Sequence, residues 1–400
     1  MKELYLHVGT PKTGTSAIQR FCADNSAILE REGISYRKMP FRYRDASAVR
    51  NGRFLMGPVT DDEGNRDEEE EKIRYTKGLE LVLEQFKTCD KVILSDESLW
   101  LYVHLDNGEA LRKLCEFGEA HGFVVKIIVY LRRQDEFIAS LWRQKVKEGR
   151  PLGEYRDYGK DGHVRKRCSY CKTLTVFRDV VGRENITVRR FERNKFVGGS
   201  ILPDFLDIFG LKLTDEYVMD NEVMNLSTNN DYTNIQRILN QLSPHPDVIF
   251  TNQSKYFADI ALRLSEKDGE YSILMDEAQT EQFMSTYMNG NHKIAKEYFG
   301  EDGDLFTAKQ KDLPVWSSDS QHFQESIIKY FGQALLDQQG RMEAMQGRIK
   351  ELEASQNELK LALEQMRTEL HSDYVQKGWI RRQISRIGRF ARRIVNHFKR

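Results

Sequence analysis

The stretch at residues 4–19, LYLHVGTPKTGTSAIQ, constrains the fold of this chain more than any other. Apolar side chains at alternate positions from Leu4 to Val8 are typical of a buried strand, Gly9 and Pro11 favour a tight turn, and the residues that follow can open a helix. The first N–H groups of such a helix lack partners within it, and together with the helix dipole they attract an anion. The stretch therefore predicts a strand, a loop and a helix that hold a phosphate or sulfate group.

The side chains of the loop suit the same role, because Lys12 adds a positive charge and Gly14 lets the backbone come close. Hydroxyl donors are supplied by Thr13, Thr15 and Ser16. The nucleotide-hydrolase P-loop is the obvious comparison, and it places a lysine directly before a Ser or Thr, after two glycines that are separated by four residues. Gly9 and Gly14 have that separation, but Thr15 stands at the position of the lysine and Lys12 lies inside the loop. The loop is therefore not a nucleotide-hydrolase P-loop.

A second apolar strand that leads into a helix lies at residues 124–144, VVKIIVYLRRQDEFIASLWRQ. Arg132 stands at the expected end of the strand, and Ser140 follows eight residues later. A guanidinium presents a rigid fork of donors that matches phosphate oxygens, and Ser140, about two helical turns on, could approach the same group. This segment predicts a second phosphate site.

A third segment, at residues 91–100, KVILSDESLW, contains a short apolar strand that ends in acidic residues. In open α/β folds ligands lie outside the carboxyl ends of the strands. We therefore expect Asp96 and Glu97 to face the same crevice as Lys12 and Arg132.

These segments together resemble the PAPS-dependent sulfotransferases of the bacterial carbohydrate type, over about residues 1–240. The run PKTGTS at residues 11–16 resembles the loop that binds the 5′-phosphosulfate of 3′-phosphoadenosine 5′-phosphosulfate (PAPS) in that family. The resemblance implies cofactor-binding roles for Pro11, Lys12, Thr13, Gly14, Thr15 and Ser16 at the 5′ end, and for Arg132 and Ser140 at the 3′-phosphate. Weaker similarity extends through residues 186–211 and to Asn225, Leu226 and Ser227.

The resemblance also implies a reaction, the transfer of a sulfuryl group from PAPS to a hydroxyl or amine of a carbohydrate or glycolipid acceptor. Glu97 would be the catalytic base, with Asp96 and the more distant His104 as alternatives. Lys12 would neutralise charge on the departing phosphate oxygen. The scheme requires no metal. A structural alternative for either carboxylate is a helix N-cap or a first-turn acid.

The order of elements predicts an α/β fold with a central parallel sheet covered by helices on both faces. Residues 61–71, with eight Asp or Glu, are expected to form a solvated loop, and residues 149–166 a loop over the acceptor. Aromatic residues near the motifs are candidate sugar platforms: Trp100, Tyr102, Trp142 and Tyr155. Expected strands span residues 3–8, 34–38, 92–95, 124–131 and 185–191, and expected helices span residues 14–31, 72–87, 109–121, 134–148 and 172–182.

Composition and cysteine usage indicate a soluble enzyme in a reducing compartment. The 400 residues are 40% hydrophobic, but no apolar run reaches the roughly 20 residues that span a membrane, and no signal peptide precedes the first strand. We therefore expect a cytoplasmic protein. The odd number of five cysteines favours free thiols. Cys168 and Cys171 form a lone C-x-x-C pair near His163, which is too few ligands for a structural zinc site.

The expected catalytic domain spans residues 1–330, and the sequence pattern changes after it. Residues 335–371 predict a coiled coil and hence self-association, with one polar residue, Gln356, in the seam. The alternative is that this helix packs on the body of the chain. One heptad position holds Leu335, Met342, Ile349, Leu363 and Leu370, and another holds Met345, Leu352, Leu359 and Met366.

Residues 377–400 carry nine Lys or Arg and no acid, with an apolar side chain every three or four residues. The pattern is typical of a basic amphipathic helix that lies on the anionic inner face of a membrane. Nucleic acid is less suited to the continuous apolar stripe, and docking onto the protein itself is the other alternative.

Two further functions compete with the sulfotransferase hypothesis. A nucleotide-dependent kinase on a related fold is disfavoured by the position of Lys12 and by the lack of an evident set of magnesium ligands. An inactive, membrane-tethered coiled-coil scaffold is disfavoured because Lys12, Glu97, Arg132 and Ser140 are all present.

Overall fold

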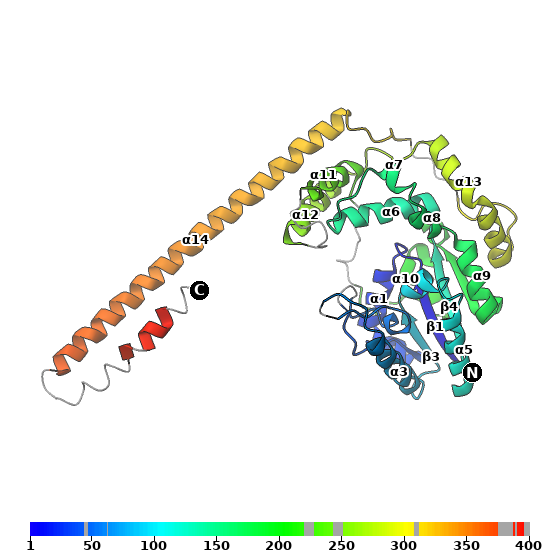
Figure 1. Ribbon diagram of the computed structural model, residues 1–400, viewed down its shortest axis with the longest axis horizontal. Helices are drawn as coiled ribbons and strands as arrows, with labels where there is room; N and C mark the ends of the chain where they lie inside the picture. The colour runs from blue at the N-terminus through cyan, green and yellow to red at the C-terminus, as the bar shows by residue number, and fades with distance from the viewer. Residues whose placement is uncertain are drawn as a thin grey trace. The chain divides into compact units, whose positions relative to one another are not determined.

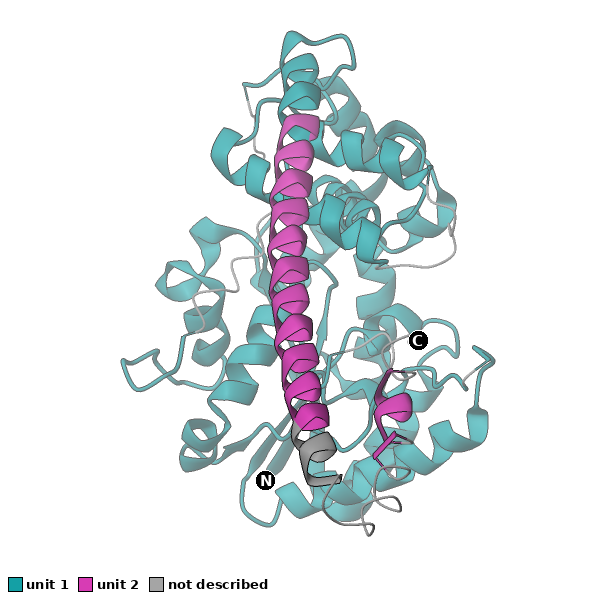
Figure 2. Cartoon of the chain, turned by 90° about the vertical axis from the view of Figure 1, so that its left-hand side faces the viewer, with its two compact units in different colours: residues 1–330 teal, residues 331–400 magenta. Residues whose placement is uncertain are grey.

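The structure is a computed structural model that describes residues 1–43, 47–61, 63–219, 228–242, 251–307, 312–374, 387–388 and 390–395. The chain divides into two compact units, Met1–Tyr330 and Phe331–Arg400 (Figure 2).

The first unit is built on a five-stranded sheet in the order β2-β3-β1-β4-β5, and every pair of neighbouring strands is parallel. The strands that contain the three motifs lie side by side, with β1 between β3 and β4. This confirms the predicted α/β fold class. The strands are β1 (Lys2–Gly9), β2 (Ile34–Ser35), β3 (Lys91–Ser95), β4 (Phe123–Leu131) and β5 (Ile186–Arg190).

Helices cover both faces of the sheet because alternate strand residues point into two separate cores. Leu4 and Leu6 of β1 face the core formed with α3 (Glu68–Gln85), α5 (Glu109–His121) and α9 (Tyr170–Val181). Tyr5 faces the core formed with the helices of the other layer (Figure 1). Those helices are α1 (Thr15–Asp24), α2 (Ser26–Arg31) and α10 (Ile201–Asp207).

A helical part follows the fourth strand and packs on α6 (Gln134–Lys147). Apolar side chains of α6, Trp142 among them, form a third core with α13 (Glu277–Ile294). The remaining helices are α4 (Ser98–Tyr102), α7 (Tyr155–Tyr158), α8 (Gly162–Lys166), α11 (Asn230–Asn240), α12 (Asn252–Asp268) and α14 (Gln321–Tyr374).

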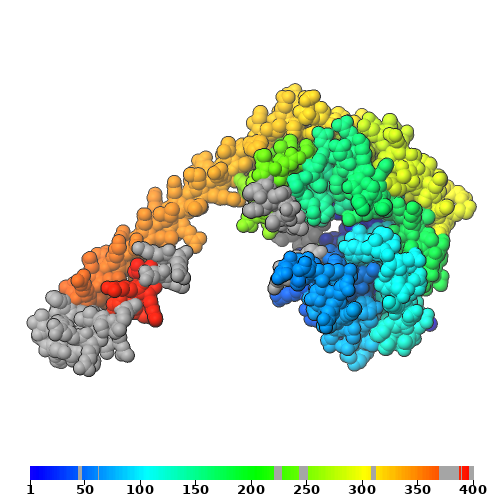
Figure 3. Space-filling view, in the orientation of Figure 1, coloured from blue at the N-terminus to red at the C-terminus, as the bar shows by residue number. Residues whose placement is uncertain are grey.

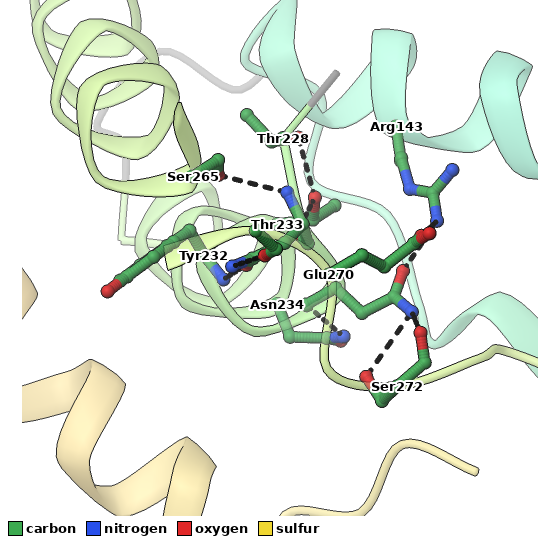
Figure 4. Close-up of polar contacts among 11 residues, drawn as sticks. Arg143, Thr228, Tyr232, Thr233, Asn234, Ser265, Glu270 and Ser272 are labelled. Carbon is green, nitrogen blue, oxygen red and sulfur yellow. Dashed lines mark hydrogen bonds and ion pairs between the residues drawn. The ribbon is translucent and has the colours of Figure 1, made fainter. Parts of the chain in front are cut away.

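Buried polar side chains hold α6 against α11. Arg143 of α6 donates to Asn230 Oδ1 at 2.8 Å and pairs with Glu270 at 3.1 Å, and Asn230 donates to the carbonyl of Ser272 at 2.8 Å (Figure 4). At the other end of α11, Asn240 donates to the carbonyl of Val146 at 2.7 Å. Buried polar groups need such partners, so this network sets the position of α6.

Two expected elements are shorter than predicted, because asparagine side chains take over backbone hydrogen bonds. The expected helix 14–31 is two helices that meet at Asn25, whose amide bonds to the carbonyl of Phe21 and to both backbone groups of Val218. The expected strand 34–38 pairs only at Ile34–Ser35. Beyond it, the side chain of Asn51 bonds to the edge of β3.

Two expected loops contain helices. The acidic run is not a solvated loop throughout, because Asp67 caps α3 through the backbone N–H of Glu70 and the acids that follow stabilise the first helical turn. Residues 149–166 contain α7 and α8, and the ring of Tyr155 packs edge-on against Trp142 with 5.7 Å between ring centroids. This buried contact makes the segment part of the helical core instead of an open loop.

The long helix α14 starts in the first unit and forms most of the second. In the second unit taken by itself, the apolar side chains at the two predicted heptad positions are exposed wherever they are described. Residues 387–388 and 390–395 are helical, and the rest of residues 377–400 lie outside the described part of the chain. Within the described residues, no helix is both long enough and apolar enough to span a membrane.

Candidate active site

The loop between β1 and α1 presents a row of backbone N–H groups. Within the described residues, the amides of residues 12–16 have no hydrogen-bond acceptor, and the first bonds of the turn run from Ala17 and Ile18 back to the carbonyl of Gly14. Left-handed backbone at Lys12 (φ 68°) and Gly14 (φ 75°) gives the loop its shape. Consecutive free amides at a helix N-terminus form a concave anion site. The surface is hollowed between the α/β part, in blue and cyan, and the helical part, in green (Figure 3).

Two glycines let other groups approach this loop closely. A Cβ at Gly14 would lie 2.7 Å from Ile201 Cδ1, and a Cβ at Gly9 would lie 3.2 Å from Glu97 Cγ. Both glycines also have positive φ angles, at which a side chain is strained. Gly14 therefore allows close packing against Ile201, and Gly9 allows the approach of Glu97. Both glycines also allow the conformation of the loop.

The structure brings Lys12 and Arg132 together, although 120 residues separate them. Nη1 of Arg132 donates to the Lys12 carbonyl at 3.1 Å, and its guanidinium lies over the ring of Phe191, 5.5 Å from the centroid. Burial, followed by the positive charges of Arg132 and Lys147, lowers the pKa of Lys12 to about 8. Two cations this close to a row of free amides make a strongly anion-attracting site.

Arg132 directly follows β4, and Ser140 lies on the next helix, α6. The carbonyl of Arg132 accepts from Tyr170 Oη at 2.8 Å, and Glu136 lies 3.4 Å from Arg132 Nε. Ser140 is half-buried on α6 and follows Glu136 by one helical turn, hence on the same helix face. The adjacent Arg133 points elsewhere and donates to the carbonyl of Thr307 at 3.4 Å.

Glu97 is held by two partners at the other side of the loop. Thr15 Oγ1 donates to Glu97 Oε1 at 2.5 Å, and Arg50 Nη2 pairs with Glu97 Oε2 at 2.7 Å. Glu97 thus contacts Thr15, the loop residue at the position that the lysine occupies in a P-loop. One carboxylate oxygen of Glu97 therefore accepts a hydrogen bond, and the other lies beside a cation.

Asp96 and His104 differ from Glu97 in position. Asp96 is buried, pairs with Arg50 Nε at 2.8 Å, and accepts from the backbone N–H of Ser98 at 2.7 Å at the start of α4. These contacts fix the turn that leads into α4 and form a structural ion pair. His104 is exposed beyond the end of α4. Among the three candidate bases, Glu97 is the one in contact with the loop.

Sequence reasoning missed Arg50, which comes from the stretch between β2 and α3. Asn51 fixes this stretch on β3, since its side chain donates to the carbonyl of Ile93 at 2.9 Å and accepts from the amide of Ser95 at 2.8 Å. A Cβ at Gly52 would lie 3.2 Å from the same amide. No periodic pattern marks the stretch, so the only sequence signal was its content of arginine.

A buried polar cluster supports the loop from below. His7 Nδ1 lies 2.8 Å from Ser95 Oγ, which also accepts from Gln19 Nε2 at 3.1 Å. Burial lowers the pKa of His7 to about 3, so the ring is neutral. The cluster ties β1, β3 and α1 together beneath the residues that face the crevice.

The aromatic residues proposed as sugar platforms are mostly unavailable. Trp100, Trp142 and Tyr155 are buried in the cores, and Tyr102 is half-buried. Asn225, Leu226 and Ser227 lie outside the described residues. In the part of the chain that the structure describes, no group of three or more His, Cys, Asp or Glu is placed to hold a metal ion.

Comparison with known proteins leaves the family open. No protein-family model matches the chain. A protein of Archaeoglobus fulgidus described as uncharacterized is 26% identical over 210 residues, which are 51% of this chain and 54% of the relative. The chain thus spans about half the length of that curated relative.

The crystal structure of a sulfotransferase from Alicyclobacillus acidocaldarius is 16% identical, with a TM-score of 0.31 over 48% of this chain and 74% of that one. A likeness with so low a TM-score supports no inference for this chain. The fold class rests on the sheet described above, and a function has to be inferred from the site.

Proposed function

We propose that the chain is a sulfotransferase that moves a sulfuryl group from PAPS to a hydroxyl or amine of a carbohydrate or glycolipid. The observation that carries this proposal is the meeting of two cations, Lys12 and Arg132, beside the free amides of residues 12–16. PAPS carries anionic groups at its 5′ and 3′ positions. The loop side of the site suits the 5′ group, and the Arg132 side suits the 3′ group. The PKTGTS loop, with its lysine inside the turn, suits the phosphosulfate.

Each residue has a separate task in this reaction. The loop amides with Thr13, Thr15 and Ser16 would hold the phosphosulfate, while Arg132 and Ser140 would hold the 3′-phosphate and so align the sulfur for in-line attack. The bond from the sulfur to the acceptor oxygen or nitrogen forms as the bond to the phosphate oxygen breaks. Glu97 takes the proton of the attacking group, and Lys12 neutralises the charge that grows on the phosphate oxygen.

Calorimetric titration with adenosine 3′,5′-bisphosphate, the product of this reaction, tests the proposal. We expect tight binding to the wild-type protein and binding weakened by roughly ten- to a hundredfold in Arg132→Ala, because a charge-assisted bidentate contact is lost. Arg133→Ala is the matched control, since that guanidinium points away from the crevice toward Thr307.

Titration with ATP and magnesium is the opposing experiment. Binding of ATP with magnesium in place of the bisphosphate would overturn the proposal in favour of a kinase. Binding of neither ligand would favour an inactive scaffold.

We propose further that the chain associates through residues 335–371 and rests on an anionic membrane surface through residues 377–400, at the cytoplasmic face. The first part is supported by the continuous helix α14 and its exposed apolar heptad side chains. The second is supported by the basic amphipathic pattern of the sequence. A membrane-facing enzyme suits a lipid-linked or membrane-associated acceptor.

A further inference from the structure

The start of α14, residues 321–330, belongs to the first unit and is fixed there by one of its faces. Ser326 Oγ donates to Asp231 Oδ2 of α11 at 3.0 Å, and Tyr330 Oη donates to the carbonyl of Phe257 in α12 at 3.0 Å. The ring of Tyr330 also stacks on that of Tyr232, with 6.3 Å between the ring centroids. These contacts hold the start of α14 in one orientation on the first unit.

The opposite face of the same turns leaves a large apolar side chain in solvent. Ile328 is 73% exposed, whereas Ser326 and Tyr330 on the docked face are buried. Ile328 precedes Leu335 by one heptad, so it continues the apolar stripe of α14 toward the start of the helix. The stripe therefore begins inside the first unit and not at residue 335.

Two glutamines in the stripe restrict how a second helix can pair with it. The stripe consists of two series with seven-residue spacing, one from Ile328 that contains Gln356 and one from Phe331 that contains Gln338. In a parallel, in-register pair each residue of the stripe faces its own copy, so the amides of the glutamines can bond to one another. One antiparallel register brings Gln338 opposite Gln356 instead. Other registers place a glutamine against apolar residues.

The charges beside the stripe distinguish these two registers. Arg348 and Glu353 flank the stripe, and both are exposed. In a parallel pair the flanking positions meet across the stripe, and Arg348 of one copy lies beside Glu353 of the other. In the antiparallel register Arg348 lies beside its own copy, and like charges repel. Charge complementarity therefore favours the parallel pair.

We propose that a second copy of the chain covers this stripe in a parallel, in-register pair, and that the contact begins at Ile328 on the first unit. Because the start of α14 is fixed on α11 and α12, the first units of the two copies then lie at the same end of the paired helices. The proposal rests on the self-association proposed above for residues 335–371, and it adds the orientation of the pair and the share of the first unit. It does not depend on the sulfotransferase reaction.

Disulfide cross-linking of the full chain tests this arrangement. Ile328→Cys and Leu363→Cys each place a thiol on the stripe, far apart along α14, and Leu336→Cys places one at an exposed position off the stripe. Each variant is oxidised with copper phenanthroline and analysed by non-reducing electrophoresis. The wild-type chain, with its own five cysteines, gives the background. An antiparallel pair cannot bring residues 328 and 363 both next to their own copies, because identical residues meet only at its centre.

We expect both stripe variants to form cross-linked dimers at least about tenfold faster than Leu336→Cys, because a disulfide requires Cα atoms within about 7 Å of one another. Cross-linking at residue 363 without cross-linking at residue 328 would overturn the contact on the first unit. Cross-linking at residue 328 alone, or at neither position, would overturn the parallel, in-register pair.

Sedimentation equilibrium of Ile328→Asp measures the same contact without a new thiol. We expect the dissociation constant of the dimer to rise by about tenfold or more, because a charge enters the stripe, and to stay unchanged in Leu336→Asp, the matched change off the stripe. Equal dissociation constants for the two variants would overturn the contact at Ile328. A monomeric wild-type chain would overturn the self-association and this pair together. Failure to bind adenosine 3′,5′-bisphosphate would instead count against the proposed sulfotransferase function alone.

Discussion

Thr15 Oγ1 donates a hydrogen bond to Glu97 Oε1 at 2.5 Å, across 82 residues of sequence. The same hydroxyl lies in the loop proposed to hold a phosphate, so a bound phosphate would compete with Glu97 for it. Arg50, the other partner of Glu97, pairs with its second carboxylate oxygen at 2.7 Å. A phosphate that takes the Thr15 hydroxyl would therefore leave Glu97 in its ion pair with Arg50.

Replacing Thr15 by valine, which removes the hydroxyl and keeps the shape, tests the loop side of this relationship. We expect roughly tenfold weaker binding of adenosine 3′,5′-bisphosphate by calorimetry, because a hydrogen bond to a charged group is lost. Thr15→Ser keeps the hydroxyl and should bind as the wild type does. Equal affinity in all three proteins would show that Thr15 contributes nothing to anion binding.

The affinity for the bisphosphate should depend on the protonation of Lys12. Burial and the nearby positive charges lower the pKa of Lys12 from 10.5 to about 8 in the free protein, so Lys12 is charged below pH 8 and loses its charge above it. A bound anion favours the charged form, and binding above pH 8 must take up a proton. We expect affinity to fall by up to about tenfold for each pH unit above 8.

The matched variant for this titration is Lys12→Arg, which keeps its charge throughout the range and should flatten the profile. A wild-type affinity that stays constant between pH 7 and 10 would contradict the assignment of Lys12 to the anion.

Arg50→Met should lower the free energy of unfolding. Asp96 and Glu97 are largely buried, at 3% and 13% side-chain exposure, and both would lose their cation. We expect a loss of about 1–3 kcal/mol in urea unfolding, since Asp96 keeps its bond to the amide of Ser98. Arg31→Met removes an exposed ion pair with Glu216 and should change nothing measurable. Similar stability of both variants would mean that Arg50 does not hold the end of β3.

Glu97→Gln and Asp96→Asn should separate chemistry from structure. Glutamine cannot accept the proton, so we expect turnover to fall by about a hundredfold or more in an assay with PAPS and a carbohydrate acceptor, with little change in unfolding. Asp96→Asn weakens a buried ion pair and should lower stability more than turnover. Near-normal turnover of Glu97→Gln would transfer the role of base to Asp96 or His104.

Ile349→Asp should weaken self-association, because it places a charge at the centre of the heptad stripe on α14. Sedimentation equilibrium should show a shift toward monomer at micromolar concentrations. Lys350→Asp, one residue along the same helix, lies off the stripe and should leave the mass unchanged. A wild-type chain that sediments as a monomer would refute the coiled-coil proposal outright.

Much of the site follows from local sequence. The alternation in β1, the glycines and the lone lysine of the loop specify a strand, an anion-binding turn and a helix, since these depend on backbone conformation over a few residues. The apolar strand before Arg132 and the acids after β3 specify where each strand ends. The parallel sheet then places these ends at one edge. The structure confirms this part of the prediction.

What the sequence by itself determined was the class of fold and the ends of three strands. Only the tertiary structure decided that Arg50 binds Asp96 and Glu97, that Thr15 donates to Glu97, and that Asn25 and Asn51 interrupt expected elements. The physical reason is that these contacts join residues between 4 and 193 positions apart through geometry that no periodic pattern encodes. Periodicity reports which face of an element is buried, but not which side chain of a distant, irregular stretch will meet it.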